Sequence, residues 1–133
     1  MSSERATPVL RSLADDLRAR SDAELADVLI ARPDLARPAP ADLTSLAARA
    51  VTQASVQRAI ESLNRAQLQV LEAAWVAGDD AQEQDIAALL GPVEDVQEPV
   101  CDALAHLRKL ALVWGATGAV RVVRPVGEVL GPF

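Results

Sequence analysis

The chain of 133 residues contains one cysteine and one histidine, which lie close together at Cys101 and His106. A thiol beside an imidazole is the arrangement of a cysteine nucleophile and its general base, so this pair is the first candidate for catalysis. Side chains five residues apart on a helix point in different directions, however, whereas Asp102 lies about one helical turn before His106. We therefore expect a solvated Asp102–His106 pair, a buried or half-buried Cys101, and no catalytic residue.

A metal site is the second candidate, because four acidic residues gather at Asp79, Asp80, Glu83 and Asp85. Carboxylates at short spacing bind Ca²⁺ in helix–loop–helix motifs, but this segment lacks the central glycine and the final bidentate glutamate of such a loop. Acids at the start of a helix instead cap free N–H groups and offset the helix dipole. The sequence therefore predicts no metal site and no cofactor.

Phosphate binding is the third candidate. Helicase motors hold nucleotide phosphates on a loop with a Gly-Lys dipeptide, and this chain has none, which excludes an ATPase of that type. Four basic residues near the end of the chain are the candidate contacts to nucleic-acid phosphates. They are Arg108, Lys109, Arg121 and Arg124.

The charge distribution opposes strong DNA binding. The net charge is −6, and residues 59–133 carry eleven acidic against five basic residues, whereas residues 1–58 carry eight of each. Basic residues supply most of the affinity for DNA by releasing counterions from phosphates. A continuous basic strip from the N-terminal arginines to the four candidates would restore DNA binding; those arginines are Arg18, Arg20, Arg49 and Arg58.

The candidates lie in a segment, residues 64–124, whose pattern predicts three helices followed by a β-hairpin. The first helix begins after Asn64, with Gln67 as its capping-box partner, and ends at Gly78. The second covers EQDIAALLG. Each of these helices carries apolar residues at intervals of three and four, which predicts that they share one core.

The third helix is expected to begin at Asp95, with Glu98 as its capping partner, so that Pro99 falls in the first turn. The stretch LVWGATGAVRVV then predicts two strands joined around glycines. Helix-helix-helix-strand-turn-strand is the pattern of a winged helix. Its predicted core is Leu68, Leu71, Trp75, Ile86, Leu89, Val100, Leu104 and Leu107, and the third helix is expected to expose Glu98, Asp102, Ala105 and Lys109, with Gln97 and Arg108 at the margins.

Residues 1–63 predict a bundle of four short helices, with the proline-rich residues 33–41 as a stiff connector between the second and the third. The predicted starts are Thr7–Pro8, Ser21 with Glu24, Asp42, and Ser55. Helices this short are marginal alone, so we expect residues 1–63 and the winged-helix residues 64–133 to pack as one unit. The predicted fold class is thus mainly α.

Half of the chain is apolar, with three aromatic residues and no run long enough to span a membrane. With a single cysteine there is no internal disulfide, and a cytoplasmic protein is the expectation. The C-terminal residues Val126, Val129, Leu130 and Phe133 are apolar at helical spacing, and the chain stops directly after them. We expect a fragment of a longer protein, with these residues either folded back, paired with a second copy or covered by a partner.

Four segments of the chain together resemble the N-terminal region of the helicase-associated proteins of actinobacteria. They are SDAELADVLIARPDL, PAPADLTSLAARAVTQASVQRAIESLN, LQVLEAAW and ALAHLRKLALVWG. The most specific pieces are Arg32-Pro33-Asp34-Leu35 and Leu112-Val113-Trp114-Gly115. Longer members of that family carry a later portion similar to the N-terminal domain of XPB-type DNA-repair helicases. The resemblance implies a non-catalytic module in a protein linked to DNA transactions.

The sequence as a whole favours a non-catalytic interaction or positioning module. Its expected partner is the downstream part of its own full-length chain or another protein, with weak nucleic-acid binding at most through this segment and no membrane association. The alternative is a winged-helix DNA-binding protein, either a transcription regulator or a repair accessory. A hydrolase built around Cys101 or His106 is the remote third hypothesis.

Overall fold

The computed structural model describes residues 11–79, 81–115 and 118–131, and this part is mainly helical, as predicted. The elements in chain order are α1 (Leu13–Ala19), α2 (Asp22–Ala31), the 3₁₀ helix η1 (Pro33–Ala36), α3 (Leu43–Ala50), α4 (Gln53–Glu61), α5 (Arg65–Ala77), α6 (Glu83–Leu90), α7 (Val93–Lys109), β1 (Val113–Trp114), β2 (Arg121–Val122) and α8 (Pro125–Leu130). None of these helices is long and apolar enough to cross a membrane.

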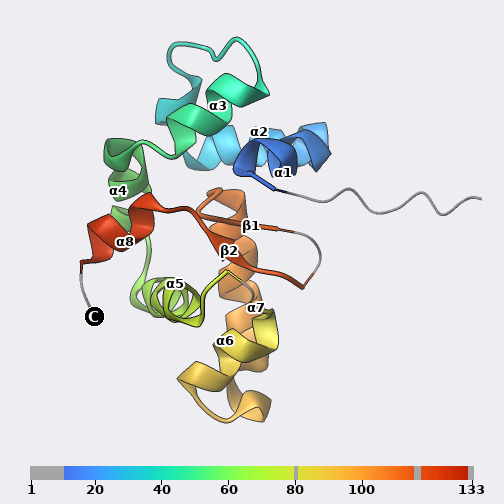
Figure 1. Ribbon diagram of the computed structural model, residues 1–133, viewed down its shortest axis with the longest axis vertical. Coiled ribbons are helices and arrows are strands. Elements are labelled where there is room, and N and C mark those ends of the chain that lie inside the picture. Colours follow the sequence, from blue (N-terminus) through green and yellow to red (C-terminus); the bar gives the residue numbers. More distant parts are fainter. Residues whose placement is uncertain (1–10, 80, 116–117, 132–133) are drawn as a thin grey trace, which may run out of the picture.

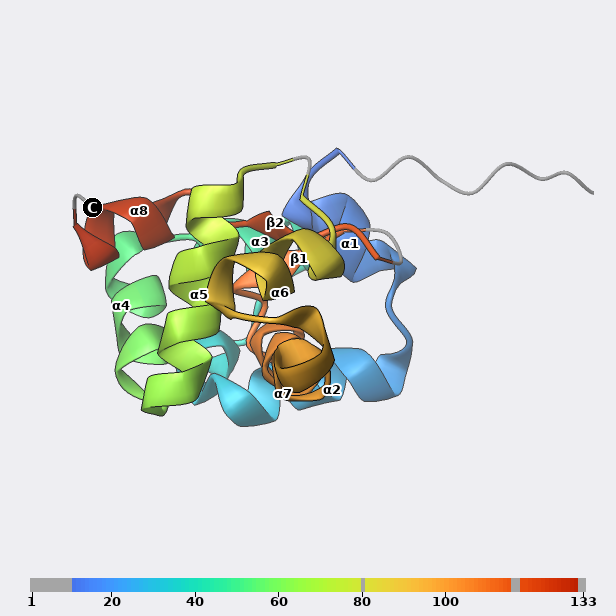
Figure 2. The ribbon, with the colours of Figure 1, turned by 90° about the horizontal axis from the view of Figure 1, so that it is seen from below.

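The elements are arranged around α7 and the small sheet (Figure 1). Helices α1, α2 and α3 gather at one end of the molecule, and α5 and α6 lie toward the other. Helix α7 packs against α2, α5 and α6, so it connects the two ends. Helices α4 and α8 lie side by side along one flank in both views (Figure 2).

The starts of α2 and α3 follow the predicted capping chemistry, whereas the start of α1 differs. Ser21 and Glu24 form the predicted capping box of α2, and Asp42 accepts a hydrogen bond from the Ser45 N–H at the start of α3. Helix α1 begins only at Leu13, after Ser12 caps it. Thr7, Pro8 and Leu10, where an earlier start was predicted, lie outside the described residues.

The segment predicted as a stiff connector holds a structural element. Residues 33–36 form η1, and the side chain of Leu35 within it is fully buried. The first part of the predicted connector is thus a 3₁₀ helix, and residues 37–41 contain no helix or strand. Proline is compatible with the first position of η1, because the N–H group at that position has no acceptor within the helix and its absence breaks no hydrogen bond.

Helix α7 also differs from the prediction at its start. Asn64 and Gln67 form the expected capping box of α5, but α7 begins at Val93 rather than after Asp95, so Asp95 does not cap it. Pro99 consequently lies inside α7 and not in its first turn. The helix tolerates this proline because the carbonyl that loses its donor belongs to Asp95, which is exposed and open to water.

The end of α7 reverses the chain toward the sheet. The Leu112 N–H donates to the Leu107 carbonyl and the Ala111 N–H to the Arg108 carbonyl, which is the hydrogen-bond pattern of a Schellman motif. Ala111 occupies the left-handed position of this motif with φ 55°, a position usually taken by glycine. Leu107, Ala111 and Leu112 are all fully buried, so packing holds the strained residue in place.

Two short strands follow, paired antiparallel with Val113 opposite Val122 and Trp114 opposite Arg121. The predicted hairpin strands are thus present, although each is only two residues long. The segment before α6 joins their edge, because the Val120 N–H donates to the Ala81 carbonyl and Gln82 forms a bridge with Ala119. The sheet therefore ties the start of α6 to the chain that leaves α7.

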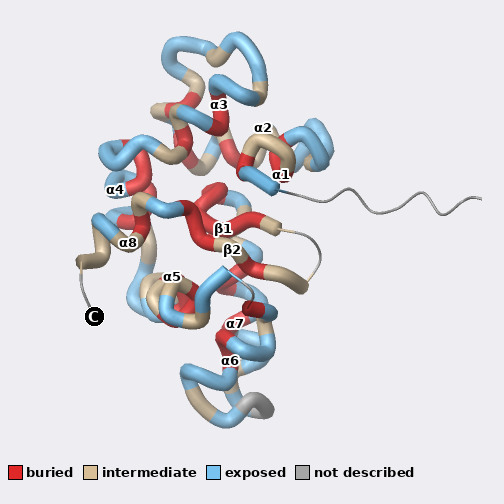
Figure 3. The backbone as a smooth tube through the Cα atoms, viewed as in Figure 1, coloured by how far each residue is buried: buried red, intermediate tan, exposed pale blue. Residues whose placement is uncertain are grey.

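The buried residues form one cluster that includes both the N-terminal helices and α5–α8 (Figure 3). Among the predicted core residues, Leu68 and Trp75 are half-buried and pack on this cluster. The prediction that Leu89 belongs to the core was wrong, because this residue is 54% exposed. Helix α6 buries the side that carries Ile86 and Ala87, and Leu89 lies about a quarter turn or more away from it. The other predicted members are buried: Leu71, Ile86, Val100, Leu104 and Leu107.

The C-terminal apolar residues fold back as α8. Val126 is fully buried, and Val129 and Leu130 pack against the core, whereas Phe133 lies outside the described residues. Of the three alternatives for these residues, the structure shows the first. Gly127 allows the close approach, because a Cβ atom added there would lie only 2.1 Å from Cζ2 of Trp75.

The variant Gly127→Ala should therefore be destabilised despite alanine's better helix propensity. The methyl group needs a shift of α8 or of the Trp75 ring, and overpacking of this kind costs roughly 1–3 kcal/mol, against a helix-propensity gain of about 0.5–1 kcal/mol. Urea unfolding followed by tryptophan fluorescence measures the change. The control is Glu128→Ala on the exposed side of α8, and equal stability of the two variants would contradict this packing.

Candidate functional site

The most unusual side chain of the described chain is Arg32, a basic residue that is only 1% exposed. It follows α2, and its guanidinium reaches three other parts of the fold. Nη1 donates to the Leu110 carbonyl at the end of α7 at 2.9 Å, and Nη2 donates to the Ala50 carbonyl at the end of α3 at 2.8 Å. Nη2 also donates to Oγ of Ser55 in α4 at 2.7 Å.

Ser55 and Asp34 complete this buried network. The Ser55 hydroxyl donates to Oδ2 of Asp34 at 2.6 Å, which brings a carboxylate close to the guanidinium through one hydroxyl. Burial lowers the pKa of Arg32 to about 10, and the charge of Asp34 acts in the opposite direction. Arg32 is thus still charged at neutral pH. Ser55 was predicted as a helix cap, but α4 begins after Thr52 and the hydroxyl is recruited into the buried network instead.

A second arginine supports the same end of α7. Arg20 donates from Nη1 to the Arg108 carbonyl at 2.7 Å and from Nε to Oδ2 of Asp16 at 2.9 Å, and both of these side chains are largely buried. Oδ1 of Asp16 accepts a hydrogen bond from the Gly115 N–H. Positive charge at the C-terminal end of a helix is favourable because the last carbonyls carry partial negative charge. Arg20 and Arg32 therefore satisfy the carbonyls at the end of α7.

Arg108 joins the residue that follows β1 to a residue shortly before β2. Its guanidinium donates to the Gly115 carbonyl at 3.2 Å and to the Ala119 carbonyl at 2.6 Å. The first of the four predicted phosphate-binding residues is therefore engaged within the chain. Its donors face the protein's own carbonyls, which leaves a smaller part of the group for a phosphate.

The other three predicted residues differ in their surroundings. Lys109 is exposed at the end of α7, and Arg121 stacks over the ring of Trp114, with 5.2 Å from Cζ to the ring centroid. Arg124 is exposed and lines a hollow with Trp75, Val122 and two acidic residues. Because Val122 and Arg121 lie on opposite faces of the strand, Arg121 points away from that hollow.

Three of the four N-terminal arginines make hydrogen bonds or ion pairs within the chain. Arg18 pairs with Asp15 and donates to Thr44, and Arg49 donates to the carbonyls of Leu35 and Pro38. Arg20 is the largely buried residue at the end of α7. Arg58 is exposed. Most of these cations thus serve the fold.

The exposed face of α7 is acidic, as predicted. Glu98, Asp102, Ala105 and Lys109 are all exposed. Asp95, which lies in the first turn of α7 rather than capping it, adds a further exposed carboxylate. Lys109 is the single lysine of the chain and stands at the end of this face. Electrostatically, the face repels phosphates.

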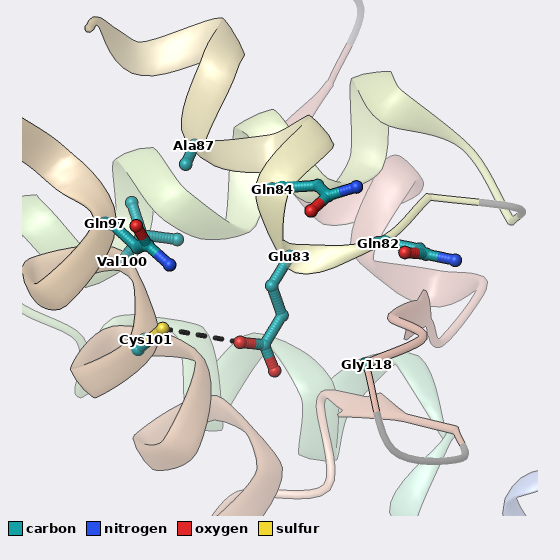
Figure 4. A pocket seen from close by; sticks show the side chains of 8 residues that line it. All are labelled: Gln82, Glu83, Gln84, Ala87, Gln97, Val100, Cys101 and Gly118. Carbon is teal, nitrogen blue, oxygen red and sulfur yellow. Dashed lines mark hydrogen bonds between the residues drawn. The ribbon is translucent and has the colours of Figure 1, made fainter. Parts of the chain in front are cut away.

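Cys101 lies on the surface of α7, so the predicted buried or half-buried position was wrong. The inward side of α7 carries Val100, Leu104 and Leu107, and Cys101 stands about a quarter turn from it, where the start of α6 is nearest. Figure 4 shows Glu83 reaching from α6 toward Cys101, whereas the side chains of Gln82 and Gln84 extend away from it.

The thiol of Cys101 donates to Oε1 of Glu83 at 3.4 Å. Desolvation raises the pKa of the thiol, and the hydrogen bond to Glu83 and its negative charge raise it further. A raised pKa keeps the group as a thiol, which is the less nucleophilic form. The environment of Cys101 thus lowers its reactivity rather than activating it.

The remaining chemical candidates do not converge in the described part of the chain. The ion pairs found there join Arg18 to Asp15 and Arg20 to Asp16, so the expected Asp102–His106 pair is not formed. Groups of three or more metal-ligating side chains are likewise not found among the described residues, which exclude Asp80. Asp85 accepts a hydrogen bond from the Gln82 N–H at the start of α6, as a capping acid does.

Loss of Arg32 should be more costly than loss of any exposed arginine. Arg32→Met leaves the buried carbonyls of Leu110 and Ala50 without a donor, so we expect a loss of roughly 3–5 kcal/mol in the free energy of unfolding. Denaturant unfolding measures this loss. Arg37→Met, at an exposed arginine of the same segment, is the control, and a difference between the two variants below about 1 kcal/mol would contradict the role of Arg32.

The thiol of Cys101 should react slowly with iodoacetamide although it is exposed. The alkylation rate should rise with pH, and the midpoint of this rise should lie above the ordinary thiol pKa of 9.0. Glu83→Gln should lower that midpoint, because it removes a neighbouring negative charge. Cys101 is the only cysteine, so the rate reports on it alone. Glu128→Gln is the control, and an unchanged profile in Glu83→Gln would contradict the contact.

No protein-family model matches this chain, and comparisons with curated proteins and with solved structures give no match. The resemblance to helicase-associated proteins therefore stays a prediction.

Proposed function

We propose that this chain is a non-catalytic interaction or positioning module, the N-terminal part of a helicase-associated protein that takes part in DNA transactions. In this proposal residues 64–124 are a winged helix, with α7 in the place of a recognition helix and β1 and β2 as the wing. The order of α5, α6, α7 and the two paired strands supports this arrangement. Its partner is the downstream part of its own full-length chain or another protein.

The observation that carries the proposal is the acidic exposed face of α7. A winged helix that reads DNA places this helix in the major groove, where the phosphates of both strands are near. Here the helix would present Asp95, Glu98 and Asp102 to those phosphates. The opposing charge favours a protein partner over DNA, since affinity for DNA comes largely from basic residues.

The internal use of arginines supports the same conclusion. Arg20, Arg32 and Arg108 direct their donors at main-chain carbonyls of the module itself. These three residues hold α1, α2 and the sheet to the end of α7. A module whose cations fix its own shape is suited to present a rigid surface, which is what positioning of a neighbouring domain needs.

The chain should accordingly bind duplex DNA only weakly, with a dissociation constant above about 1 µM at physiological salt. Fluorescence anisotropy with random and selected duplexes at several salt concentrations measures this. A nanomolar, sequence-dependent signal would overturn the proposal and establish the DNA-binding alternative, with Lys109 and Arg121 as the first residues to test.

A charge-reversal pair tests the placement of α7 in the same assay. Glu98→Lys with Asp102→Lys should strengthen DNA binding if α7 occupies the recognition position. The control is Glu61→Lys with Glu128→Lys, which makes the same change in net charge at exposed positions of α4 and α8. Equal gains in the two double variants would show that only net charge matters, which would contradict the proposed winged-helix placement.

A further inference from the structure

Exposed apolar side chains of the described residues concentrate at one groove between α5 and α6. The large ones are Ile30, Val76, Leu89 and Leu90, and three of these four line a hollow of about 470 Å³. Gln69, Glu72 and Ala73 of α5 complete its wall. We call this hollow the α5–α6 groove. Clustered apolar exposure of this kind marks interaction surfaces more often than scattered single residues do.

The groove has the form of a helix-binding surface. Its α5 wall consists of residues 69, 72, 73 and 76, which follow the i, i+3, i+4, i+7 spacing of one helix face. Leu89 and Leu90 form the opposite wall from the last turn of α6. Two helices with an apolar hollow between them accept a third helix by side-chain interdigitation, which is a common mode of peptide recognition.

The one charged residue in the groove lining, Glu72, is negative. On α5, Glu72 lies one turn before the exposed Val76, and on α6, Asp85 lies one turn before the exposed Leu89. Residues i and i+4 of a helix share a face, so Glu72 lies beside Val76, whereas the carboxylate of Asp85 accepts a hydrogen bond from the Gln82 N–H at the start of α6. The groove lining contains no basic residue.

The helix ends add to this negative potential. Val76 lies in the last turn of α5, and Leu89 and Leu90 lie in the last turn of α6. The last turn of each helix carries no basic residue, so the partial negative charge of its terminal carbonyls is not offset by a side chain. A ligand that places positive charges beside an apolar stripe would complement both features.

We infer that the α5–α6 groove binds an amphipathic helix of a partner protein, with leucine-like residues on one stripe and lysine or arginine along its borders. This inference rests on the proposed function, because it names the surface through which the interaction module acts. A second copy of the chain is a poorer occupant, since a two-fold contact would set the same carboxylates against one another.

The test uses a fluorescein-labelled amphipathic peptide of roughly 18 residues, about five helical turns, with leucines at i, i+3, i+4 and i+7 and lysines beside them. A matched peptide has glutamate in place of every lysine. Anisotropy titration should give a dissociation constant on the order of 10 µM for the lysine peptide and binding at least about tenfold weaker for the glutamate peptide. Amide chemical-shift changes should lie on α5 and α6.

Two groove variants and one control locate the binding. Val76→Gln and Leu89→Gln should each weaken the lysine peptide by about tenfold or more without a change in melting temperature, since both side chains are exposed. Ile30→Gln removes an exposed apolar residue of α2, outside the groove, and should leave binding unchanged. Glu72→Gln should weaken the lysine peptide but not the glutamate peptide.

Other results overturn the inference. They are the absence of binding, equal binding of both peptides, equal loss in Ile30→Gln, or shift changes confined to the acidic face of α7. A dimer of the chain in sedimentation that Leu89→Gln dissociates would assign the groove to a second copy. If the peptide does not bind and DNA binding is weak, the groove inference fails but the proposed function is not contradicted. Nanomolar DNA binding would contradict the proposed function, whatever the peptide results.

Discussion

The buried guanidinium of Arg32 is the interaction on which the tertiary arrangement depends. It joins the end of α2 to the ends of α3 and α7 and to the hydroxyl of Ser55, so four segments meet at one charged group. Burying a charge is costly, and this cost is offset only when the donors reach well-placed acceptors. A guanidinium has a planar set of donors that can serve several carbonyls at once, which a lysine ammonium at the same position would not reproduce. The network thereby favours one relative placement of these helices over others that would bury similar apolar area.

The hydrogen bonds of the arginines also affect which charges are left for the surface. Residues 1–58 hold eight arginines against eight acidic residues. Four of these arginines donate to side chains or carbonyls of the chain itself: Arg18, Arg20, Arg32 and Arg49. The acids, in contrast, remain largely in solvent along α7 and beside the α5–α6 groove. The exposed charges along α7 are therefore mainly acidic. This acidic surface is the physical basis of the proposed preference for a basic partner over a nucleic acid.

Local chemistry explains which features were predictable. The capping box of α5 at Asn64 and Gln67, the capping box of α2 and the aspartate cap of α3 are interactions within four residues, so they can be read from spacing alone. The start of α7 was not read correctly in this way. Asp95 and Glu98 have capping spacing, but the helix already begins at Val93, and the Pro92 carbonyl accepts from the N–H groups of Asp95 and Val96. The burial of Leu89 was predicted wrongly because apolar spacing alone does not define the buried side of α6. The apolar residues of α6 nearly encircle it, and only the position of its neighbours decides which of them are buried.

The sequence by itself determined the mainly helical class, the approximate extent of most elements, the two paired strands and the acidic exposed face of α7, because periodicity and capping act over one or two turns. Only the tertiary structure decided the roles of Arg32, Ser55 and Cys101. The Arg32-Pro33-Asp34-Leu35 stretch stood out in the sequence, but nothing in it signals that the guanidinium reaches Leu110, which lies 78 residues away. Whether a polar side chain caps a helix, faces water or lies buried depends on acceptors contributed by distant segments, and these are brought together only when the helices pack.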